Sequence, residues 1–225
     1  MGRVEPTAGA DLSRTWALVP IRGLESAKTR LGADLDPEER TTLVTELLRR
    51  TLAATRDARR IAGTVVVTMD GAAAEIARRH RAVGLVERAP GLNGAIEAAC
   101  SLAQARGATA VVVVPADIPA VSAAALDELV AAANDAVRSA TADGGEDHGV
   151  VALVPDRHGE GTNALLVSPP DLIRPAFGTL SRARHEAAAR TAGARFVALD
   201  GPLALDVDTA ADLLDAEAAL GPLRG

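Results

Sequence analysis

Short apolar runs rich in β-branched residues alternate along the chain with longer segments in which apolar positions recur every three or four residues. The short runs predict seven strands, at Trp16–Pro20, Thr64–Met69, Gly84–Glu87, Ala110–Val114, Val150–Val154, Ala164–Val167 and Arg195–Leu199. The longer segments predict helices, at Gly71–Ala82, Asn93–Arg106, Ser122–Ser139, Ser181–Ala192 and Asp208–Leu220. This alternation is typical of crossover connections, so the predicted fold class is α/β, with three layers and a mostly parallel, mixed central sheet of about seven strands.

A further helix, between the first two strands, has the clearest start signal. Asp36 can cap it, Pro37 suits the first helical position, and Glu38 and Glu39 make its first turn acidic. The residues of its apolar face are Leu43, Val44, Leu47, Leu48 and Leu52. Such a stripe predicts a helix that covers one face of the sheet.

The length and the apolar content indicate one domain. The chain has 225 residues, of which 48% are hydrophobic, enough for one sizeable core and too few for two. Residues 1–14 are polar, without an apolar run, and predict a flexible N-terminal tail before a single domain at 15–225. Residues 141–148, with the sequence TADGGEDH, predict a mobile insertion loop within that domain.

Composition narrows the possible partners. A formal net charge of −6 and only three aromatic residues argue against binding to a nucleic-acid polymer, although a local basic cluster could still hold a small anion. The single cysteine, Cys100, has no internal disulfide partner, which fits a reducing compartment and a packing role. Without a secretory signal or an apolar run of roughly 18 residues, we expect a cytoplasmic protein with no membrane contact. It could be a monomer or a homodimer.

A basic loop follows the first predicted strand. The segment PIRGLESAKTRL from Pro20 carries Arg22, Lys28 and Arg30, and Lys28 is the only lysine beside 23 arginines. Chance survival of one lysine and a need for a compact ammonium group are equally good explanations. The loop is neither a Walker loop nor a GxGxxG fingerprint. Its three cations could bind a triphosphate. Taken without other signals, however, such a segment is more often a solvated loop with scattered charges.

Two segments place aspartates at positions where ligands bind in open α/β sheets. Asp117 follows a strand of four valines, and Mg²⁺ prefers such carboxylate oxygens. Asp206 and Asp208 alternate near the C-terminus and would point the same way in extended chain. Both observations have plainer explanations, because aspartate is common in turns and Asp208 has the sequence context of a helix N-cap.

The segment PDRHGEGTNAL from Pro155 is the most unusual in the sequence. Its two glycines free backbone N–H groups, and with the Thr162 hydroxyl they could seat a phosphate or a carboxylate. A Cys/His metal site is not indicated, because the histidines lack ligand spacing; they are His80, His148, His158 and His185.

Six segments, in order from Trp16 to about Leu214, resemble the 2-phospho-L-lactate guanylyltransferase family of deazaflavin coenzyme biosynthesis, whose actinobacterial members act on phosphoenolpyruvate. The segments are VPIRGLESAKTRL from Val19, GLN from Gly91, VPADIP from Val114, PDRHGEGTNALL from Pro155, FGTLSRARH from Phe177 and LDVDTAADL from Leu205. PDRHGEGTNALL is highly specific, whereas VPADIP would suit many nucleotidyltransferases. The sequence departs from the family at Arg22, where lysine is usual, and at FGTLS, which replaces FGPGS.

The resemblance implies a Rossmann-like nucleotidyltransferase fold, akin to molybdopterin guanylyltransferases and sugar nucleotidyltransferases. Within it, Asp117, Asp206 and Asp208 would hold one or two Mg²⁺ ions. Of these, Asp117 and Asp206 are predicted to be catalytic, together with Lys28.

The resemblance also assigns the two substrates. Thr162, Gly178 and Ser181 would bind the acceptor acid. Nucleotide binding would fall to Arg22, Lys28, Arg30 and Asn93. The substrates would be GTP and phosphoenolpyruvate or 2-phospho-L-lactate, and the unstable product could pass directly to a downstream transferase.

Two rival functions stay open at this point. The chain could transfer a nucleotide to another phosphorylated acceptor, such as 3-phosphoglycerate or molybdopterin, because such relatives differ mainly in the acceptor pocket. It could also be a catalytically silent nucleotide-binding regulator, although three carboxylates and a lysine argue against silence.

Overall fold

The structure is a computed structural model that describes residues 9–25, 28, 31–32, 34–87, 91–142 and 148–223. Its strands are β1 (Thr15–Ile21), β2 (Ile61–Thr68), β3 (Val83–Val86), β4 (Ala110–Val113), β5 (Val150–Val154), β6 (Ala164–Ser168) and β7 (Arg195–Ala198). Its helices are α1 (Pro37–Asp57), α2 (Gly71–Arg79), α3 (Gly91–Ala105), α4 (Ala123–Ala142), α5 (Ser181–Thr191), α6 (Ala210–Leu220) and the short 3₁₀ helix η2 (Pro202–Ala204). All seven predicted strands and all six predicted helices are present.

The seven strands form one sheet in the order β3-β2-β1-β4-β6-β5-β7. Only β6 runs antiparallel to its neighbours, β4 and β5; the other pairings are parallel. The prediction of a mostly parallel, mixed sheet is therefore confirmed. Because the strands on both sides of β6 run in the same direction, their carboxyl ends share one edge of the sheet.

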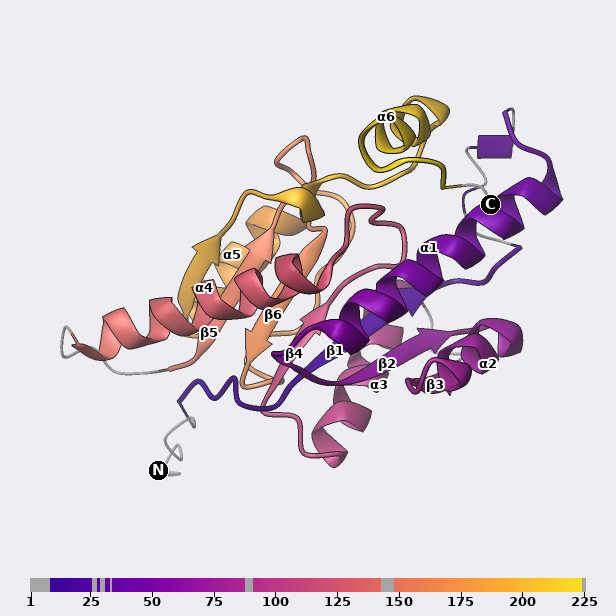
Figure 1. Ribbon diagram of the computed structural model, residues 1–225. Coiled ribbons are helices and arrows are strands. Elements are labelled where there is room, and N and C mark those ends of the chain that lie inside the picture. The colour runs from indigo at the N-terminus through magenta and orange to yellow at the C-terminus, as the bar shows by residue number, and fades with distance from the viewer. Residues whose placement is uncertain are drawn as a thin grey trace.

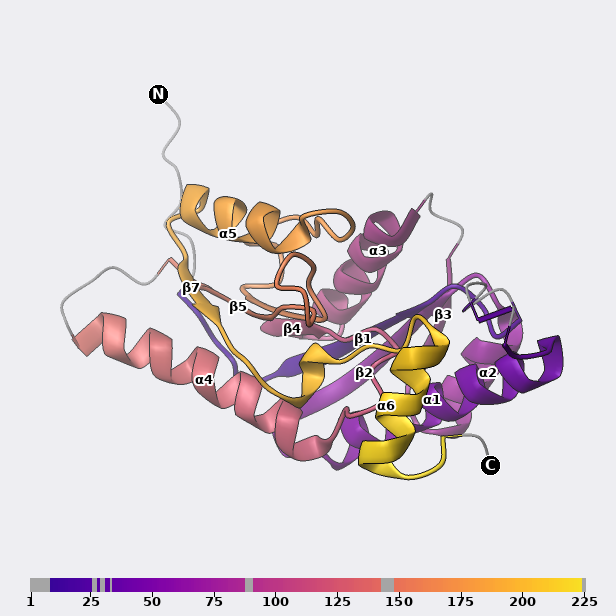
Figure 2. The same ribbon diagram turned by 90° about the horizontal axis from the view of Figure 1, so that it is seen from above.

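Helices cover both faces of the sheet. Figure 2 shows the sheet between α1 and α4 on one side and α3 and α5 on the other. The alternation of β1 assigns its side chains to the two layers: Ala17 packs with α1 and α4, whereas Leu18 packs with α3. Along β4, Val112 and Val113 divide in the same way, so burial on both faces explains the uninterrupted valine run.

Helix α1 begins as its sequence predicts. Asp36 accepts hydrogen bonds from the backbone N–H groups of Glu38 and Glu39, and the Glu39 carboxylate accepts one from the backbone N–H of Asp36. Leu43 and Leu47 of its buried face also contact α6, which lies beside the first turns of α1 in Figure 1. The C-terminal helix is thereby fixed near the segment that carries Asp206 and Asp208.

Two predicted segments fall partly outside the described residues. Of the predicted tail, residues 1–8 lie outside them, and so do residues 143–147 of the predicted loop. Helix α4 continues through Ala142, so the first two residues of that loop, 141 and 142, are helical. Among the described residues, no helix is both long and apolar enough to cross a membrane.

Cys100, on α3, is partly buried. Its thiol lies 3.2 Å from the Pro170 carbonyl oxygen, to which it donates. Burial first, and then the negative charges of Asp171 and Glu97, raise the pKa of this thiol to about 11.

We therefore expect thiol reagents to modify Cys100 about 100-fold more slowly than a free cysteine at about pH 8, because only the thiolate reacts. Unfolding in denaturant should restore the normal rate. A colorimetric thiol assay with and without denaturant measures this, and a folded-state rate equal to that of free cysteine would contradict the raised pKa.

Candidate active site

Three segments far apart in the sequence meet at the carboxyl edge of the sheet. The loop after β1 supplies Lys28, the turn after β4 supplies Asp117, and the extended segment before α6 supplies Asp206 and Asp208. The backbone N–H of Val207 donates to the Asp117 carbonyl oxygen at 3.1 Å. This bond joins the two acidic segments directly, so their carboxylates are held at one place.

The ammonium group of Lys28 bridges two of the carboxylates. Its Nζ lies 2.9 Å from Asp117 Oδ2 and 3.0 Å from Asp208 Oδ1. Burial alone would lower the pKa of Lys28, whose side chain is only 6% exposed, but Asp117 and Asp208 raise the pKa above its ordinary value. The lysine is therefore charged at neutral pH and neutralises part of the acidic cluster.

The backbone of Lys28 is itself unusual. Its φ angle is +57°, in the left-handed region that residues with a side chain adopt at a cost of roughly 1–2 kcal/mol. The two ion pairs offset this cost and hold the side chain toward Asp117 and Asp208. The pairing therefore gives the only lysine of the sequence a definite structural position.

Asp206 lies beside Asp117 and Asp208, and its pKa is shifted. Burial first, and then the neighbouring charges of Asp117 and Asp208, raise the pKa of its carboxyl, while a hydrogen bond from Asn163 acts in the opposite direction. Asn163 also holds the preceding η2 turn, because its Nδ2 donates to the carbonyl oxygens of Leu203 and Ala204 at 3.1 and 2.9 Å. The three predicted aspartates therefore share one electrostatic environment.

The donor chemistry of this cluster fits a divalent cation. Two carboxylates pair with the Lys28 ammonium and a third lies beside them, and carboxylate oxygens are the ligands that Mg²⁺ prefers. Within the described residues, however, no three Asp, Glu, His or Cys side chains already stand around a common cation position. In this structure the Lys28 ammonium lies between Asp117 and Asp208.

The buried carboxylate of Asp212 fixes the backbone that carries Asp208. Its Oδ2 accepts the N–H groups of Asp208 and Thr209 at 2.9 and 2.8 Å, and its Oδ1 pairs with the Arg157 guanidinium. Thr209 is the N-cap of α6, so the alternative role of Asp208 as a helix cap is wrong. The Asp208 side chain pairs with Lys28.

Replacing Asp212 with alanine is expected to destabilise the fold by about 1–3 kcal/mol, through loss of the cap and of the bonds to Arg157. Burial alone would raise the pKa of Asp212, but its N–H donors, the Thr209 hydroxyl and Arg157 lower it. With a lowered folded-state pKa, this contribution is present above the unfolded pKa and is lost as the pH falls through the folded value. Urea denaturation at neutral and acidic pH measures both effects.

The exposed Asp215, on the same helix, is the matched control. Asp215→Ala should leave the free energy of unfolding within about 0.5 kcal/mol of the parent. An Asp212→Ala variant as stable as the Asp215→Ala variant would show that the capping interactions do not matter for stability.

The predicted anion-binding segment is a loop organised by Asp156. The Asp156 Oδ1 accepts the N–H groups of His158 and Glu160 at 3.2 and 3.0 Å. A Cβ on Gly161 would lie 2.5 Å from Asp156 Oδ2, so glycine is needed at this close approach. Since Arg157 pairs with Asp212, the loop is also tied to the start of α6.

Thr162 and Ser181, two of the predicted acceptor-binding residues, are in direct contact. Ser181 Oγ donates to Thr162 Oγ1 at 3.1 Å, at the first turn of α5. Gly178 precedes this turn with φ +119°, a conformation that requires glycine, and a Cβ there would meet nothing within 4 Å. The departure from FGPGS to FGTLS therefore keeps the first glycine, whereas Leu180, with φ +53°, stands in place of the second.

His185 is a member of this cluster that the sequence did not single out. Its Nδ1 lies 3.1 Å from Thr162 Oγ1, and its Nε2 accepts the backbone N–H of Ala176 at 2.9 Å. Burial first, and then the charge of Arg184, lower the pKa of His185 to about 4, so it is neutral under physiological conditions. A usable signal was present, because His185 follows Ser181 by four residues and so shares its helix face.

Asn93, a predicted nucleotide-binding residue, bonds the protein backbone in this structure. Its carboxamide bonds the backbone of Phe177 twice, accepting from the N–H at 2.8 Å and donating to the carbonyl oxygen at 3.1 Å. It thereby joins the start of α3 to the loop that contains Gly178. Its predicted contact with the nucleotide stays a prediction.

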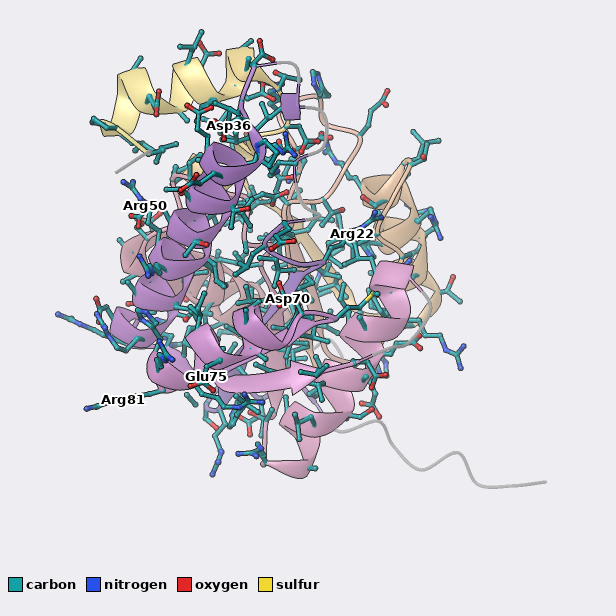
Figure 3. All side chains as sticks on the ribbon, turned by 90° about the vertical axis from the view of Figure 1, so that its right-hand side faces the viewer. Arg22, Asp36, Arg50, Asp70, Glu75 and Arg81 are labelled. Atoms are coloured by element: carbon teal, nitrogen blue, oxygen red, sulfur yellow. The ribbon has the colours of Figure 1, made fainter. Side chains whose placement is uncertain are left out.

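The basic residues of the nucleotide loop are only partly described. Arg22 is exposed, and its carbonyl oxygen accepts the Thr68 hydroxyl, whereas Arg30 lies outside the described residues. A separate pocket of about 430 Å³ is lined by Arg56, Arg79, His80 and Arg81. It lies near the amino ends of β2 and β3, and Figure 3 shows Arg81 well apart from Arg22. Asp57 and Glu75 pair with two of its arginines. None of the residues that line this pocket belongs to the acidic site.

The chain is similar to known proteins over most of its length. A family model described as "Guanylyl transferase CofC like" matches residues 15–217. A protein of Sphaerobacter thermophilus named phosphoenolpyruvate guanylyltransferase is 42% identical over 201 residues, which cover 88% of this chain and 90% of that protein. A protein of Conexibacter woesei with the same name is 37% identical over 201 residues, with coverages of 88% and 85%.

A solved structure supports the fold independently. A nucleotidyl transferase from Methanothermobacter thermautotroptrophicus superimposes with a TM-score of 0.61 at 16% sequence identity, covering 92% of this chain and 97% of that one. At this identity the likeness shows the shared fold alone. The fold is therefore that of the nucleotidyltransferases, as the sequence predicts.

Proposed function

This chain belongs to the family of CofC-like guanylyl transferases, and from that membership we propose that it transfers GMP from GTP to phosphoenolpyruvate in deazaflavin coenzyme biosynthesis. The products are enolpyruvyl-diphospho-5'-guanosine and pyrophosphate. The observation that carries the proposal is the meeting of Lys28, Asp117 and Asp208 at the carboxyl edge of the sheet, with Asp206 beside them. Two relatives that are 42% and 37% identical to this chain over 201 residues carry the same acceptor in their names.

In the proposed reaction, a phosphate oxygen of the acceptor attacks the α-phosphorus of GTP in line. The bond from that phosphorus to the bridging oxygen of pyrophosphate breaks, and pyrophosphate leaves with the electron pair. No general base is needed, because a phosphate monoester is already an anion near neutral pH. The difficulty is electrostatic, since two polyanions approach each other and charge moves to the leaving group.

A cation held by the acidic cluster would reduce the repulsion between the two polyanions. Asp117, Asp206 and Asp208 are the proposed Mg²⁺ ligands, which fits their carboxylate oxygen donors. Bound Mg²⁺ would supply charge neutralisation at the phosphate oxygens. Lys28, with Arg22 and Arg30, is proposed to stabilise the departing pyrophosphate.

The acceptor site is proposed to lie at the start of α5. The Thr162 hydroxyl and the backbone at Gly178 offer donors for an acid's phosphate or carboxylate oxygens, and the Ser181 hydroxyl, at the first turn of α5, bonds Thr162. The loop of Asp156 and the pair of Arg157 with Asp212 hold this region next to the aspartates. Acceptor and nucleotide would then meet over one edge of the sheet.

Mass spectrometry of products from GTP, Mg²⁺ and a panel of phosphorylated acids tests the proposal. The panel contains phosphoenolpyruvate, 2-phospho-L-lactate and 3-phosphoglycerate, and pyrophosphate is measured in parallel. We expect a guanylylated adduct with phosphoenolpyruvate and one pyrophosphate for each adduct. Preference for another acid would replace the acceptor, while GTP binding without any pyrophosphate would identify a silent nucleotide-binding protein.

The proposed substrates also suggest where the protein works. GTP and phosphoenolpyruvate are intracellular metabolites, so the reaction would take place in the cytoplasm. Because the diphosphate-bridged product is reactive, we propose that a downstream transferase receives it directly. Dilution of the coupled reaction tests this transfer, since a product handed over directly should lose little yield to hydrolysis.

A further inference from the structure

Three buried polar side chains lie behind the proposed acceptor site. The exposed fractions are 0% for His185, 1% for Ser181 and 8% for Thr162. Buried polar atoms need protein partners, because little or no water reaches them. The hydrogen bonds among these three residues therefore fix how each proton is placed.

The proton of the His185 ring can be assigned from its partners. Ala176 donates its backbone N–H to Nε2 at 2.9 Å, so Nε2 acts as an acceptor and carries no proton. A neutral imidazole has one proton, which must then sit on Nδ1. Nδ1 faces Thr162 Oγ1 at 3.1 Å and is consequently the donor of that hydrogen bond.

The Thr162 oxygen receives a second hydrogen bond from the other side. Ser181 Oγ donates to the same Oγ1 at 3.1 Å. A hydroxyl oxygen has two lone pairs, and His185 and Ser181 occupy both. Among the hydrogen bonds within the described part of the chain, none takes the proton of the Thr162 hydroxyl. That proton is thus available to a ligand, whereas the lone pairs are not.

The position of His185 is held from several directions. The Phe177 ring meets the imidazole edge-on, with 5.1 Å between ring centroids. Asn93 bonds both sides of the Phe177 backbone, so the aromatic ring is itself anchored to α3. Ser181 and His185 share one face of α5. The ring is therefore not free to turn over and exchange the roles of its two nitrogens.

We propose that His185 is a positioning residue that makes the Thr162 hydroxyl a one-way hydrogen-bond donor toward the acceptor substrate. The site then favours an acid that presents an unprotonated phosphate or carboxylate oxygen at this point, and it disfavours a group that must donate. The inference rests on the proposed function in one respect, namely that Thr162 lines the acceptor site. It adds a residue and a selection rule to that site.

The first test reads the tautomer directly in the ligand-free protein. Nitrogen-15 NMR of the histidine side chains should show His185 as the neutral Nδ1–H form, assigned by its absence from a His185→Phe spectrum. The exposed His158 serves as the internal reference for a solvated ring. A neutral Nε2–H ring or a doubly protonated ring at neutral pH would overturn the proposal, whatever the enzyme's substrate proves to be.

The second test separates acceptor binding from nucleotide binding. His185→Phe keeps an aromatic ring but cannot donate to Thr162, and it should raise the KM for phosphoenolpyruvate by about 10-fold while leaving the KM for GTP unchanged. His185→Asn, whose amide can stand near the Nδ1 position, should recover most of the loss. Equal increases in both KM values would indicate a merely structural role and overturn the proposal.

A double-mutant cycle connects the effect to Thr162. In a Thr162→Val background the hydroxyl is absent, so adding His185→Asn or His185→Phe should change the KM for phosphoenolpyruvate less than about twofold. Additive effects would overturn the proposal. Should the parent enzyme make no adduct with phosphoenolpyruvate, the proposed function fails instead, and the NMR result still decides the placement of the proton.

Discussion

Replacing Asp206 with asparagine is expected to lower kcat for the transfer of GMP to phosphoenolpyruvate by at least about 100-fold. Asparagine keeps the shape of the side chain and one oxygen, but it removes the negative charge. In the proposed mechanism that charge helps to hold the cation which neutralises the phosphates, so its loss acts on the transition state. Steady-state kinetics at saturating GTP and Mg²⁺ measure the effect.

The same substitution should not destabilise the protein. Burial and the charges of Asp117 and Asp208 raise the pKa of Asp206, so its ionised form is disfavoured in the folded state. A raised folded-state pKa means that the charge opposes folding at neutral pH, and its removal should leave the melting temperature unchanged or slightly higher. Loss of activity without loss of stability is the pattern of a functional residue.

The exposed Asp200 provides a matched control for this substitution. Asp200→Asn should keep both the rate and the melting temperature of the parent. Isothermal titration with Mg²⁺ and a non-hydrolysable GTP analogue adds a binding measurement for each variant. An Asp206→Asn enzyme that retains a near-normal rate would remove Asp206 from the proposed metal site.

The order and type of the elements could be predicted because they depend on local pattern. The capping box at Asp36 and the valine run of β4 carry their own signals, and both structures form as expected. Where a local signal was ambiguous, the prediction left it open. Asp208 was left open as a metal ligand or an N-cap, and in the structure the cap is Thr209, whose side chain accepts the backbone N–H of Asp212.

The contacts that make the site depend on residues distant in sequence, and local patterns do not encode them. Lys28 pairs with Asp208 across 180 residues, and no spacing within the chain predicts that an ammonium separates two of the proposed ligands. The link from Arg157 to Asp212 is hidden for the same reason, because it joins two loops that only the folded sheet brings together. His185 was dismissed since it lacks metal-ligand spacing, although its bonds serve a hydroxyl and not a metal.

The lone lysine gives the other large effect that we expect. Lys28→Arg preserves the positive charge, yet it should lower kcat by at least about 10-fold. One nitrogen of Lys28 lies 2.9 and 3.0 Å from two carboxylates in a position where the side chain is 6% exposed. A planar guanidinium is larger and spreads its donors, so it would push Asp117 and Asp208 apart or leave the pocket.

Comparison of three side chains at this position separates charge from shape. Lys28→Met removes the charge and should reduce kcat by about 100-fold or more, leaving Asp117 and Asp208 to repel each other. The raised pKa of Lys28 keeps the ammonium charged below its ordinary pKa, so assays between about pH 6 and 8 compare fully charged forms of lysine and arginine. If charge alone mattered, Lys28→Arg would match the parent and only Lys28→Met would fail. If kcat instead falls in steps, from lysine to arginine and from arginine to methionine, a compact ammonium is required. Unchanged kinetics in both variants would make the single lysine an accident of composition.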